Sequence, residues 1–178
     1  MTLREKMRRW LSNTGVTPVG RKMKQFVRLI AVLALFLFSL SLNAYAQSEF
    51  VYLNNGIPGT NSVSVFSLAT NGTLTEISGS PFPTGGSGFT GSPILIVGNF
   101  LYAGNSNSNS ISAFSIDPRT GILTVVPGSP FSIDGFSFGT TMTIAATPDS
   151  KLLMASTITS GTISIFSIAG DGRLAPEE

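Results

Sequence analysis

The 178-residue chain contains no cysteine and no histidine, and only 11% of its residues are charged. Without cysteine, the chain cannot form disulfides, thiolate metal sites or a thiolate nucleophile. Without histidine, Ser-His-Asp and Cys-His catalysis are excluded, together with most zinc sites. We therefore expect no metal site and no cofactor.

The few charged residues are unevenly distributed along the chain. Residues 1–46 hold eight Lys and Arg and one Glu, a net charge of +7, whereas residues 47–178 hold three bases and eight acids, a net charge of −5. The basic balance thus belongs to the N-terminal segment. The mildly acidic remainder lacks the basic surface that binding to nucleic acid requires, so we expect no nucleic-acid partner.

A secretory signal peptide is predicted over residues 23–46. A short basic segment precedes an apolar run of 14 residues, Leu29–Leu42, and Ala44 and Ala46 then stand at the two positions that signal peptidase reads, just before Gln47. A membrane anchor is the alternative, but this run is shorter than the roughly 20 residues that a spanning helix needs. We expect cleavage before Gln47, a periplasmic or extracellular location, and membrane contact only through the signal segment before cleavage.

Residues 1–22 precede this signal peptide and extend its basic end. They are either a long n-region of the signal or an upstream extension, because Met23 followed by Lys24 would itself make a good translation start. The sequence leaves both alternatives open.

The mature region, residues 47–178, contains one apolar strand three times. The copies are Ser62–Leu68 (SVSVFSL), Ser110–Ile116 (SISAFSI) and Thr162–Ile168 (TISIFSI), at intervals of 48 and then 52 residues. Such a period is typical of a repeated supersecondary unit. Apolar side chains occur at both odd and even positions of each copy, so they point to both faces of the strand and both faces require apolar cover.

Each copy belongs to a module of four short antiparallel strands joined by Gly, Pro and Asn turns. The modules cover about residues 49–79, 93–128 and 141–178. The glycines and prolines between residues 79 and 93 exclude regular structure there. Four-stranded modules without helical periodicity predict an all-β fold, a β-propeller of about three blades. A β-sandwich is the competing all-β fold, but it does not predict repeated copies of strand and turn.

The modules share further residues besides the central strand. A strand with Tyr and Asn precedes it in Phe50–Asn55 and Phe100–Asn105, an Asp/Asn-Gly turn follows it, and Gly-Ser-Pro-Phe comes after the first two copies. Over residues 49–178 this pattern resembles the lactonase-like β-propellers of the bacterial 6-phosphogluconolactonase type, which are related to Tyr-Val-Thr-Asn repeat propellers. The resemblance implies a seven-bladed ring, closed by a strand from the opposite terminus, and hydrolysis of a sugar lactone as the family activity.

Compared with that family, the chain has only about three of seven blades. The first module lacks an innermost strand, and the third departs from the pattern at Ser150, Met154 and Thr157. An arc of three blades would leave an apolar face exposed at each end. The resemblance therefore implies an N-terminal fragment whose partners are the remaining blades of its own full-length chain.

The candidate site residues lie on one rim of the expected propeller. Loops of a four-stranded meander alternate between two rims, and propeller enzymes usually bind ligands beside the loops between second and third strands. The weak candidates for ligand binding on this rim are Asn54, Asn55, Asn105 and Asn107. Asp134 is its clearest titratable residue and a weak candidate for the general base, although an Asp in Ile-Asp-Gly is more often a turn residue.

Three functions are compatible with these residues. The protein is a lactone hydrolase whose activity needs residues beyond this chain, a noncatalytic extracytoplasmic propeller that binds a small molecule or a protein, or a surface structural repeat. Export and the neutral rim favour the binding protein, since 6-phosphogluconolactone is a cytosolic metabolite. The family resemblance favours the hydrolase.

Overall fold

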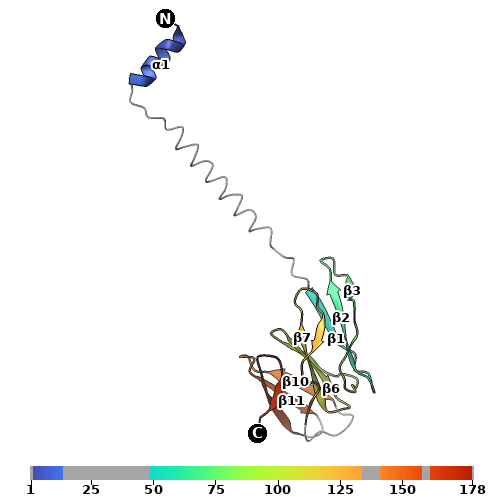
Figure 1. The fold of residues 1–178 in the computed structure, drawn as a ribbon. Helices are drawn as coiled ribbons and strands as arrows, with labels where there is room; N and C mark the ends of the chain where they lie inside the picture. The colour runs from blue at the N-terminus through green and yellow to red at the C-terminus, as the bar shows by residue number, and fades with distance from the viewer. Residues whose placement is uncertain (1, 14–48, 134–140, 158–160, 178) are drawn as a thin grey trace. The chain divides into compact units, whose positions relative to one another are not determined.

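The structure is a computed structural model that describes residues 2–13, 49–133, 141–157 and 161–177 (Figure 1). The chain divides into two units, residues 1–46 and residues 47–178. The predicted signal peptide with its cleavage site at Ala44, Ala46 and Gln47 lies outside the described residues, and so does Asp134.

The described part of the first unit is one helix, α1 (Leu3–Asn13), which the sequence analysis did not predict. At the start of the helix, the backbone N–H of Thr2 donates to Glu5 Oε2 at 2.9 Å, and the N–H of Glu5 donates to the carbonyl of Thr2 at 3.0 Å. Two otherwise unpaired groups at the helix start are thereby satisfied. No described helix has the length and apolar character that crossing a membrane requires.

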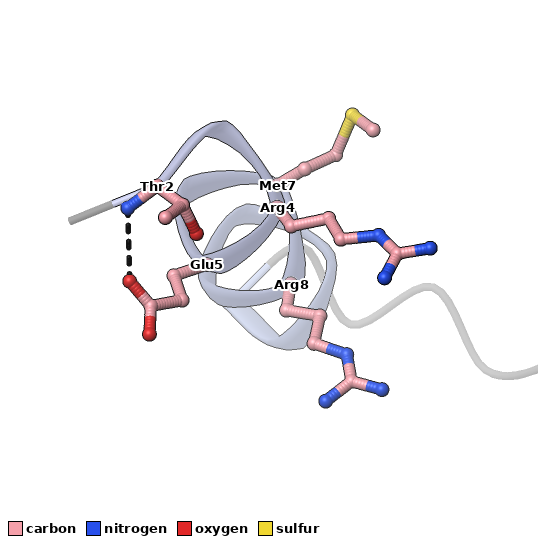
Figure 2. Close-up of a pocket in the computed structure, with 5 residues that line it drawn as sticks. All are labelled: Thr2, Arg4, Glu5, Met7 and Arg8. Carbon is pink, nitrogen blue, oxygen red and sulfur yellow. Dashed lines mark hydrogen bonds between the residues drawn. The ribbon is translucent and has the colours of Figure 1, made fainter.

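A shallow hollow on α1 is lined by exposed residues of its first turns. Figure 2 shows that Arg4 and Arg8 project together, away from Glu5 and its bond to Thr2. Because residues of this one helix form the whole lining, the hollow is not an enclosed binding site.

The described part of the second unit forms three antiparallel sheets in chain order, here called sheets A, B and C (Figure 1). Sheet A has β1 (Glu49–Asn54), β2 (Ser62–Leu68), β3 (Leu74–Glu76) and β4 (Phe82–Pro83). Sheet B has β5 (Ile94–Val97), β6 (Phe100–Asn105), β7 (Ser110–Ile116), β8 (Leu123–Val125) and β9 (Phe131–Ser132). Sheet C has β10 (Met142–Ala146), β11 (Leu152–Thr157), β12 (Ile163–Ile168) and β13 (Leu174–Pro176).

The strand orders β5-β6-β7-β8 and β10-β11-β12-β13 are those of four-stranded meanders, so the predicted blade topology is confirmed. The repeated apolar strands are β2, β7 and β12. β7 and β12 are the third strands of their meanders, and β2 is their equivalent in sheet A. Sheet A has the order β1-β2-β3, and no described strand precedes β1 in the place that β5 and β10 occupy.

Two short strands occur where the sequence predicted none. β4 pairs with the start of β2, and β9 pairs with the start of β7. Ser80 lies just before β4, and Ser129 lies just before β9. Their hydroxyls accept hydrogen bonds, both of 2.9 Å, from the backbone N–H groups of Val65 and Ala113. The prediction of irregular structure over residues 79–93 was wrong at Phe82–Pro83, because side-chain bonds return this part of the segment to the sheet edge despite its glycines and prolines.

Each sheet has a front face, which points toward the next sheet along the chain, and a rear face on the other side. The front of sheet A and the rear of sheet B enclose one buried cluster: Val63, Val65, Leu101, Ala103, Phe114 and Leu123. The front of sheet B and the rear of sheet C enclose a second cluster that includes Ile111, Ala113, Leu153, Ala155, Phe166 and Leu174. β7 is therefore apolar on both faces, as predicted. Full burial of one such aliphatic side chain contributes about 1.5–3 kcal/mol.

An aromatic ring on one sheet covers a turn glycine of the next sheet at both interfaces. A Cβ at Gly121 would overlap the ring of Phe50, and a Cβ at Gly172 would overlap the ring of Phe100. Both glycines also have positive φ angles, +74° and +84°. Glycine is required at these turns because it alone allows the backbone conformation and the close approach together.

Candidate functional site

Three loops meet at one end of sheets A and B, and we call this end the loop rim. They are the β1–β2 loop (residues 55–61), the connection between sheets A and B (residues 84–93) and the β6–β7 loop (residues 106–109). Ser87 joins them: its hydroxyl accepts from Gly59 N–H at 2.8 Å, its N–H donates to the Ser108 hydroxyl at 2.9 Å, and its carbonyl accepts from Asn107 N–H at 3.0 Å. The Gly/Ser connection is therefore tied to both neighbouring loops.

Asn54 lies at the end of β1 and points toward sheet B. Its amide nitrogen donates to the carbonyls of Pro93 at 2.9 Å and Gly104 at 3.0 Å. Its amide oxygen accepts from Asn61 Nδ2 at 2.9 Å and from Gly56 N–H at 3.3 Å. Both donors and both acceptor positions of the Asn54 amide are thus used within the protein.

Asn61 is the centre of the network and was not among the predicted site residues. The side chain is buried, with its amide nitrogen donating to the amide oxygens of Asn54 at 2.9 Å and Asn105 at 3.0 Å. The amide oxygen of Asn61 accepts from the backbone N–H groups of Ile57 at 3.2 Å and Ser62 at 2.9 Å. One side chain therefore bonds its own loop, its own sheet and the neighbouring sheet B.

Asn105, also fully buried, completes the network on sheet B. Its amide nitrogen donates to the hydroxyls of Ser110 at 3.2 Å and Ser112 at 2.7 Å. Its amide oxygen accepts from Asn61 and from the Thr84 hydroxyl at 2.8 Å. We call Asn54, Asn61, Thr84 and Asn105 the asparagine network.

Asn55 repeats within sheet A what Asn105 does within sheet B. Its amide nitrogen donates to the hydroxyls of Ser62 at 2.8 Å and Ser64 at 3.0 Å, the two residues equivalent to Ser110 and Ser112. This match follows from the Asn and the Ser-x-Ser segment that both modules contain, although the Asn precedes the first serine by seven positions in sheet A and by five in sheet B. The fourth predicted asparagine differs: the buried Oδ1 of Asn107 has no hydrogen-bond partner among the described residues.

Two glycines of the connection between sheets A and B lie directly against the network. A Cβ at Gly88 would come within 2.7 Å of the Asn61 side-chain carbon Cγ, and a Cβ at Gly86 would overlap the Asn105 side chain. The glycines of this segment therefore permit close packing against asparagine side chains.

The opposite end of the sheets, here the turn rim, carries the charged turns. Hydrogen bonds from the backbone of Arg119 and Thr120, with Arg119 the larger cause, lower the pKa of Asp117. The Thr147 hydroxyl and then the Lys151 backbone N–H lower the pKa of Asp149. These carboxylates are exposed and serve their own turns, as Asx-turn residues do.

Two equivalent tyrosines lie between the sheets near the turn rim. Burial, and secondarily the charge of Asp171, raises the pKa of Tyr102 to about 12. Burial and then the charge of Asp117 raise the pKa of Tyr52. The Tyr102 hydroxyl donates to the Gly172 carbonyl at 3.1 Å, whereas the buried Tyr52 hydroxyl has no described partner.

The described loop rim offers neutral hydrogen-bonding groups and no titratable side chain. Its accessible polar groups are hydroxyls, amides and backbone groups of residues 55–61, 84–93 and 106–109. The described residues contain no cluster of acidic side chains that could hold a metal ion. This surface can bind a polar, uncharged molecule, and general-base catalysis would require a group outside the described residues.

Sequence reasoning missed Asn61, Thr84 and Ser112, although a signal for the first was present. Asn61 and Asn109 each precede a copy of the repeated strand, as Asn-Ser-Val-Ser and Asn-Ser-Ile-Ser. This repetition marks a structural requirement at the start of the strand. The repetition did not indicate that Asn105 of another sheet is the partner of Asn61.

The repeated four-stranded sheets, stacked face to face with equivalent residues at equivalent contacts, define a β-propeller. Residues 45–177 match the model of the lactonase family of seven-bladed β-propellers, and the chain belongs to this family. The resemblance inferred from the sequence is therefore confirmed. No sequence among the curated proteins matches the chain.

Several solved structures are similar to the chain. The periplasmic gluconolactonase of Pseudomonas aeruginosa superposes with a TM-score of 0.60 at 22% identity, over 72% of this chain and 36% of its own, which shows likeness of fold alone. A candidate 6-phosphogluconolactonase of Bacteroides fragilis has a TM-score of 0.55 at 26% identity, over 72% and 35%. A second candidate, from Bacteroides uniformis, has a TM-score of 0.56 at 25% identity, over 72% and 36%. The chain thus spans about a third of the length of these proteins.

Proposed function

We propose that this protein is an exported propeller of the lactonase family that binds an uncharged sugar lactone, and that the family's complete ring hydrolyses it. Membership of the lactonase family supports the reaction class. The similar Bacteroides fragilis structure is named as a candidate 6-phosphogluconolactonase, which supports lactone hydrolysis as the reaction class.

The neutral loop rim is the observation that favours an uncharged lactone over a phosphorylated one. Recognition of phosphate usually relies on Arg or Lys, and the described loops of this rim contain neither. The bases Arg119, Lys151 and Arg173 belong to turns on the turn rim. A neutral sugar lactone needs only hydroxyl and amide partners, which the loop rim supplies.

Asp134 is the residue that we propose as the general base. In the sequence it stands three positions after Phe131, as Gly85 of the loop rim stands three positions after Phe82 in the first module. Ester hydrolysis needs such a base to activate water, together with hydrogen-bond donors for the developing oxyanion. Asn107 is the proposed ligand contact, since its half-buried side chain belongs to the β6–β7 loop of this rim.

Export is supported by the sequence of residues 23–46. The N-terminus of the protein recovered from the periplasm or medium tests it, and Gln47 is the expected first residue. A protein recovered only from the cytoplasm with residues 23–46 still attached would contradict export.

Substrate class is tested on a polypeptide that contains this chain and forms a complete ring, by measuring its hydrolysis and its calorimetric binding of gluconolactone and of gluconolactone 6-phosphate. We expect gluconolactone to be preferred by about tenfold or more, equivalent to about 1.4 kcal/mol. Asn107→Ala should weaken binding, and Asp134→Asn should abolish hydrolysis with binding retained. Asn99→Ala, at an exposed position on the turn rim, is the matched control and should change neither.

A noncatalytic binding protein is the second candidate, favoured by the absence of any titratable side chain from the described loops. It predicts calorimetric binding of the lactone without turnover and no effect of Asp134→Asn. Absence of binding with every lactone tested would contradict both lactone-binding candidates and leave a propeller that binds a protein or a structural repeat protein.

A further inference from the structure

The helix α1 carries its apolar and its charged side chains on different faces. Leu3, Met7 and Trp10 follow one another at intervals of four and then three residues, and residues at this spacing lie on one face of an α-helix. A surface hollow on α1 confirms the arrangement, because these three residues and Lys6 form its lining. The three apolar side chains are 84%, 59% and 66% exposed. We call them the apolar face of α1.

Basic side chains border the apolar face. Successive residues of an α-helix are about 100° apart around its axis, which places Arg4 at one edge of the face and Lys6 at the other. Arg8 lies next to Arg4 around the helix, and Figure 2 shows that these two side chains project together. Arg9 and Glu5 lie on the opposite side. Four bases and one acid give α1 a net charge of +3.

This arrangement is typical of a helix that lies in the interface of a membrane. Such helices bury an apolar face at the boundary between headgroups and acyl chains and carry Lys and Arg on the polar face. Arg4 and Lys6 can lay their methylene groups along the apolar boundary and keep their charges in water. Trp10 suits the same level, because the indole ring is apolar and its N–H is polar.

The length of α1 also favours a partner surface. α1 has 11 residues, and an isolated helix of this length is only marginally stable in water. Burial of the apolar face would stabilise the helix, since most helical stability comes from packing of an amphipathic face.

The charge of the whole segment identifies the kind of membrane. Residues 14–28 add four bases and no acid to the +3 of α1, and the apolar run Leu29–Leu42 of the predicted signal peptide follows them. Basic residues beside an apolar membrane segment stay on the cytoplasmic side. The leaflet on that side carries anionic lipid, which attracts Lys and Arg.

We propose that α1 is a membrane-binding helix that lies on an anionic lipid surface, with Leu3, Met7 and Trp10 among the outer acyl groups and the basic side chains at the lipid phosphates. Membrane contact then extends beyond the signal segment, and α1 holds the precursor at the membrane until cleavage. The cytoplasmic leaflet as its location rests on the proposed export, whereas lipid binding by α1 does not.

Trp10 is the only tryptophan of the chain, so tryptophan fluorescence reports on α1 alone. The test uses the full, uncleaved chain and vesicles of equal parts phosphatidylglycerol and phosphatidylcholine, compared with vesicles of phosphatidylcholine alone. We expect the emission to shift to shorter wavelength as Trp10 leaves water. The lipid concentration at half-maximal shift should be lower by about tenfold or more on the anionic vesicles, because charge attraction adds to apolar burial.

Two variants with the same change in charge separate the apolar face from the rest of the helix. Met7→Asp places a carboxylate in the apolar face, whereas Ser12→Asp places one on the opposite side. We expect Met7→Asp to lose the Trp10 shift and Ser12→Asp to keep most of it. Met7→Leu, which keeps the face apolar, should behave as the unmodified chain does. All variants retain residues 29–42, so the signal segment can still bring each chain to the vesicles.

A Trp10 shift of equal size in Met7→Asp would overturn the proposal, because the signal segment would then be its cause. Unchanged emission on anionic vesicles would overturn it as well, whether α1 packs on protein, with emission already shifted without lipid, or binds added DNA instead. A precursor that begins at Met23 in cells would also overturn it, since α1 would be absent. Failure of export with lipid binding intact would contradict only the proposed function.

Discussion

The A–B and B–C interfaces are built on the same apolar register, and the polar bonds between their described residues lie at opposite rims; residues 134–140 and 158–160 of the loop rim lie outside this description. At the A–B interface the asparagine network links the sheets at the loop rim, while the Tyr52 hydroxyl at the turn rim has no described partner. At the B–C interface the polar bond lies at the turn rim, from Tyr102 to the Gly172 carbonyl. The aromatic ring over a turn glycine is common to both.

The difference shows which contacts the repeat supplies and which it does not. Apolar positions recur in every module because each sheet must be covered on both faces. The polar bonds depend on single residues that are not present in all modules. Sheet C, for example, has Met154 where Tyr52 and Tyr102 stand.

The largest effect is expected where a shared contact is broken. Gly172→Ala forces a methyl group into the Phe100 ring and places alanine at φ +84°, whereas Gly72→Ala has the same φ with open space around it. We expect a loss of about 3–4 kcal/mol for Gly172→Ala and about 1–2 kcal/mol for Gly72→Ala, since overpacking and positive φ each have a cost. Denaturant unfolding measures both, and equal losses would show that the ring contact is unimportant.

The asparagine network is tested by Asn61→Ala. The substitution removes donors to Asn54 and Asn105 and leaves the backbone N–H groups of Ile57 and Ser62 without their acceptor. A loss of about 3 kcal/mol of unfolding free energy is expected, because buried polar groups lose their partners. Asn99→Ala, exposed on the turn rim, should cost less than about 0.5 kcal/mol. A similar small loss for Asn61→Ala would contradict a structural role for the network.

The two tyrosines allow a direct comparison of the interfaces with one chemical change. Tyr102→Phe removes a buried hydrogen bond and should cost about 1–2 kcal/mol, whereas Tyr52→Phe removes a hydroxyl that has no partner and should be neutral or slightly stabilising. Thermal unfolding of the two variants gives the difference. A larger loss for Tyr52→Phe would mean that its hydroxyl is bonded in solution.

The smallest expected effect is a pH dependence of the unfolding free energy, which is seen only in alkaline solution. Burial raises the pKa of Tyr102 to about 12, whereas the unfolded chain ionises this residue near pH 10. The neutral tyrosine is favoured in the folded protein, so its contribution to stability is complete below about pH 10 and is lost as pH rises toward 12. Ultraviolet absorbance of tyrosinate follows the titration, and Tyr102→Phe should remove its latest step. A Tyr102 that titrates near pH 10 in the folded protein would be inconsistent with burial.

Much of the fold could be predicted from the sequence because its signals are local. The three copies of the apolar strand, now β2, β7 and β12, and the turn residues between strands indicated four-stranded modules, and the structure confirms them. The short strands β4 and β9 could not be predicted, since they depend on bonds from Ser80 and Ser129 to another strand. The site residues on the loop rim stay predictions, with Asp134 outside the described residues.

The sequence by itself determined the blade, its family and the need for apolar cover on both faces, because strand period, turn chemistry and composition act over a few residues. Only the tertiary structure decided what the asparagines do. Asn61 and Asn105 are 44 positions apart, and their 3.0 Å bond exists because two sheets stack in register.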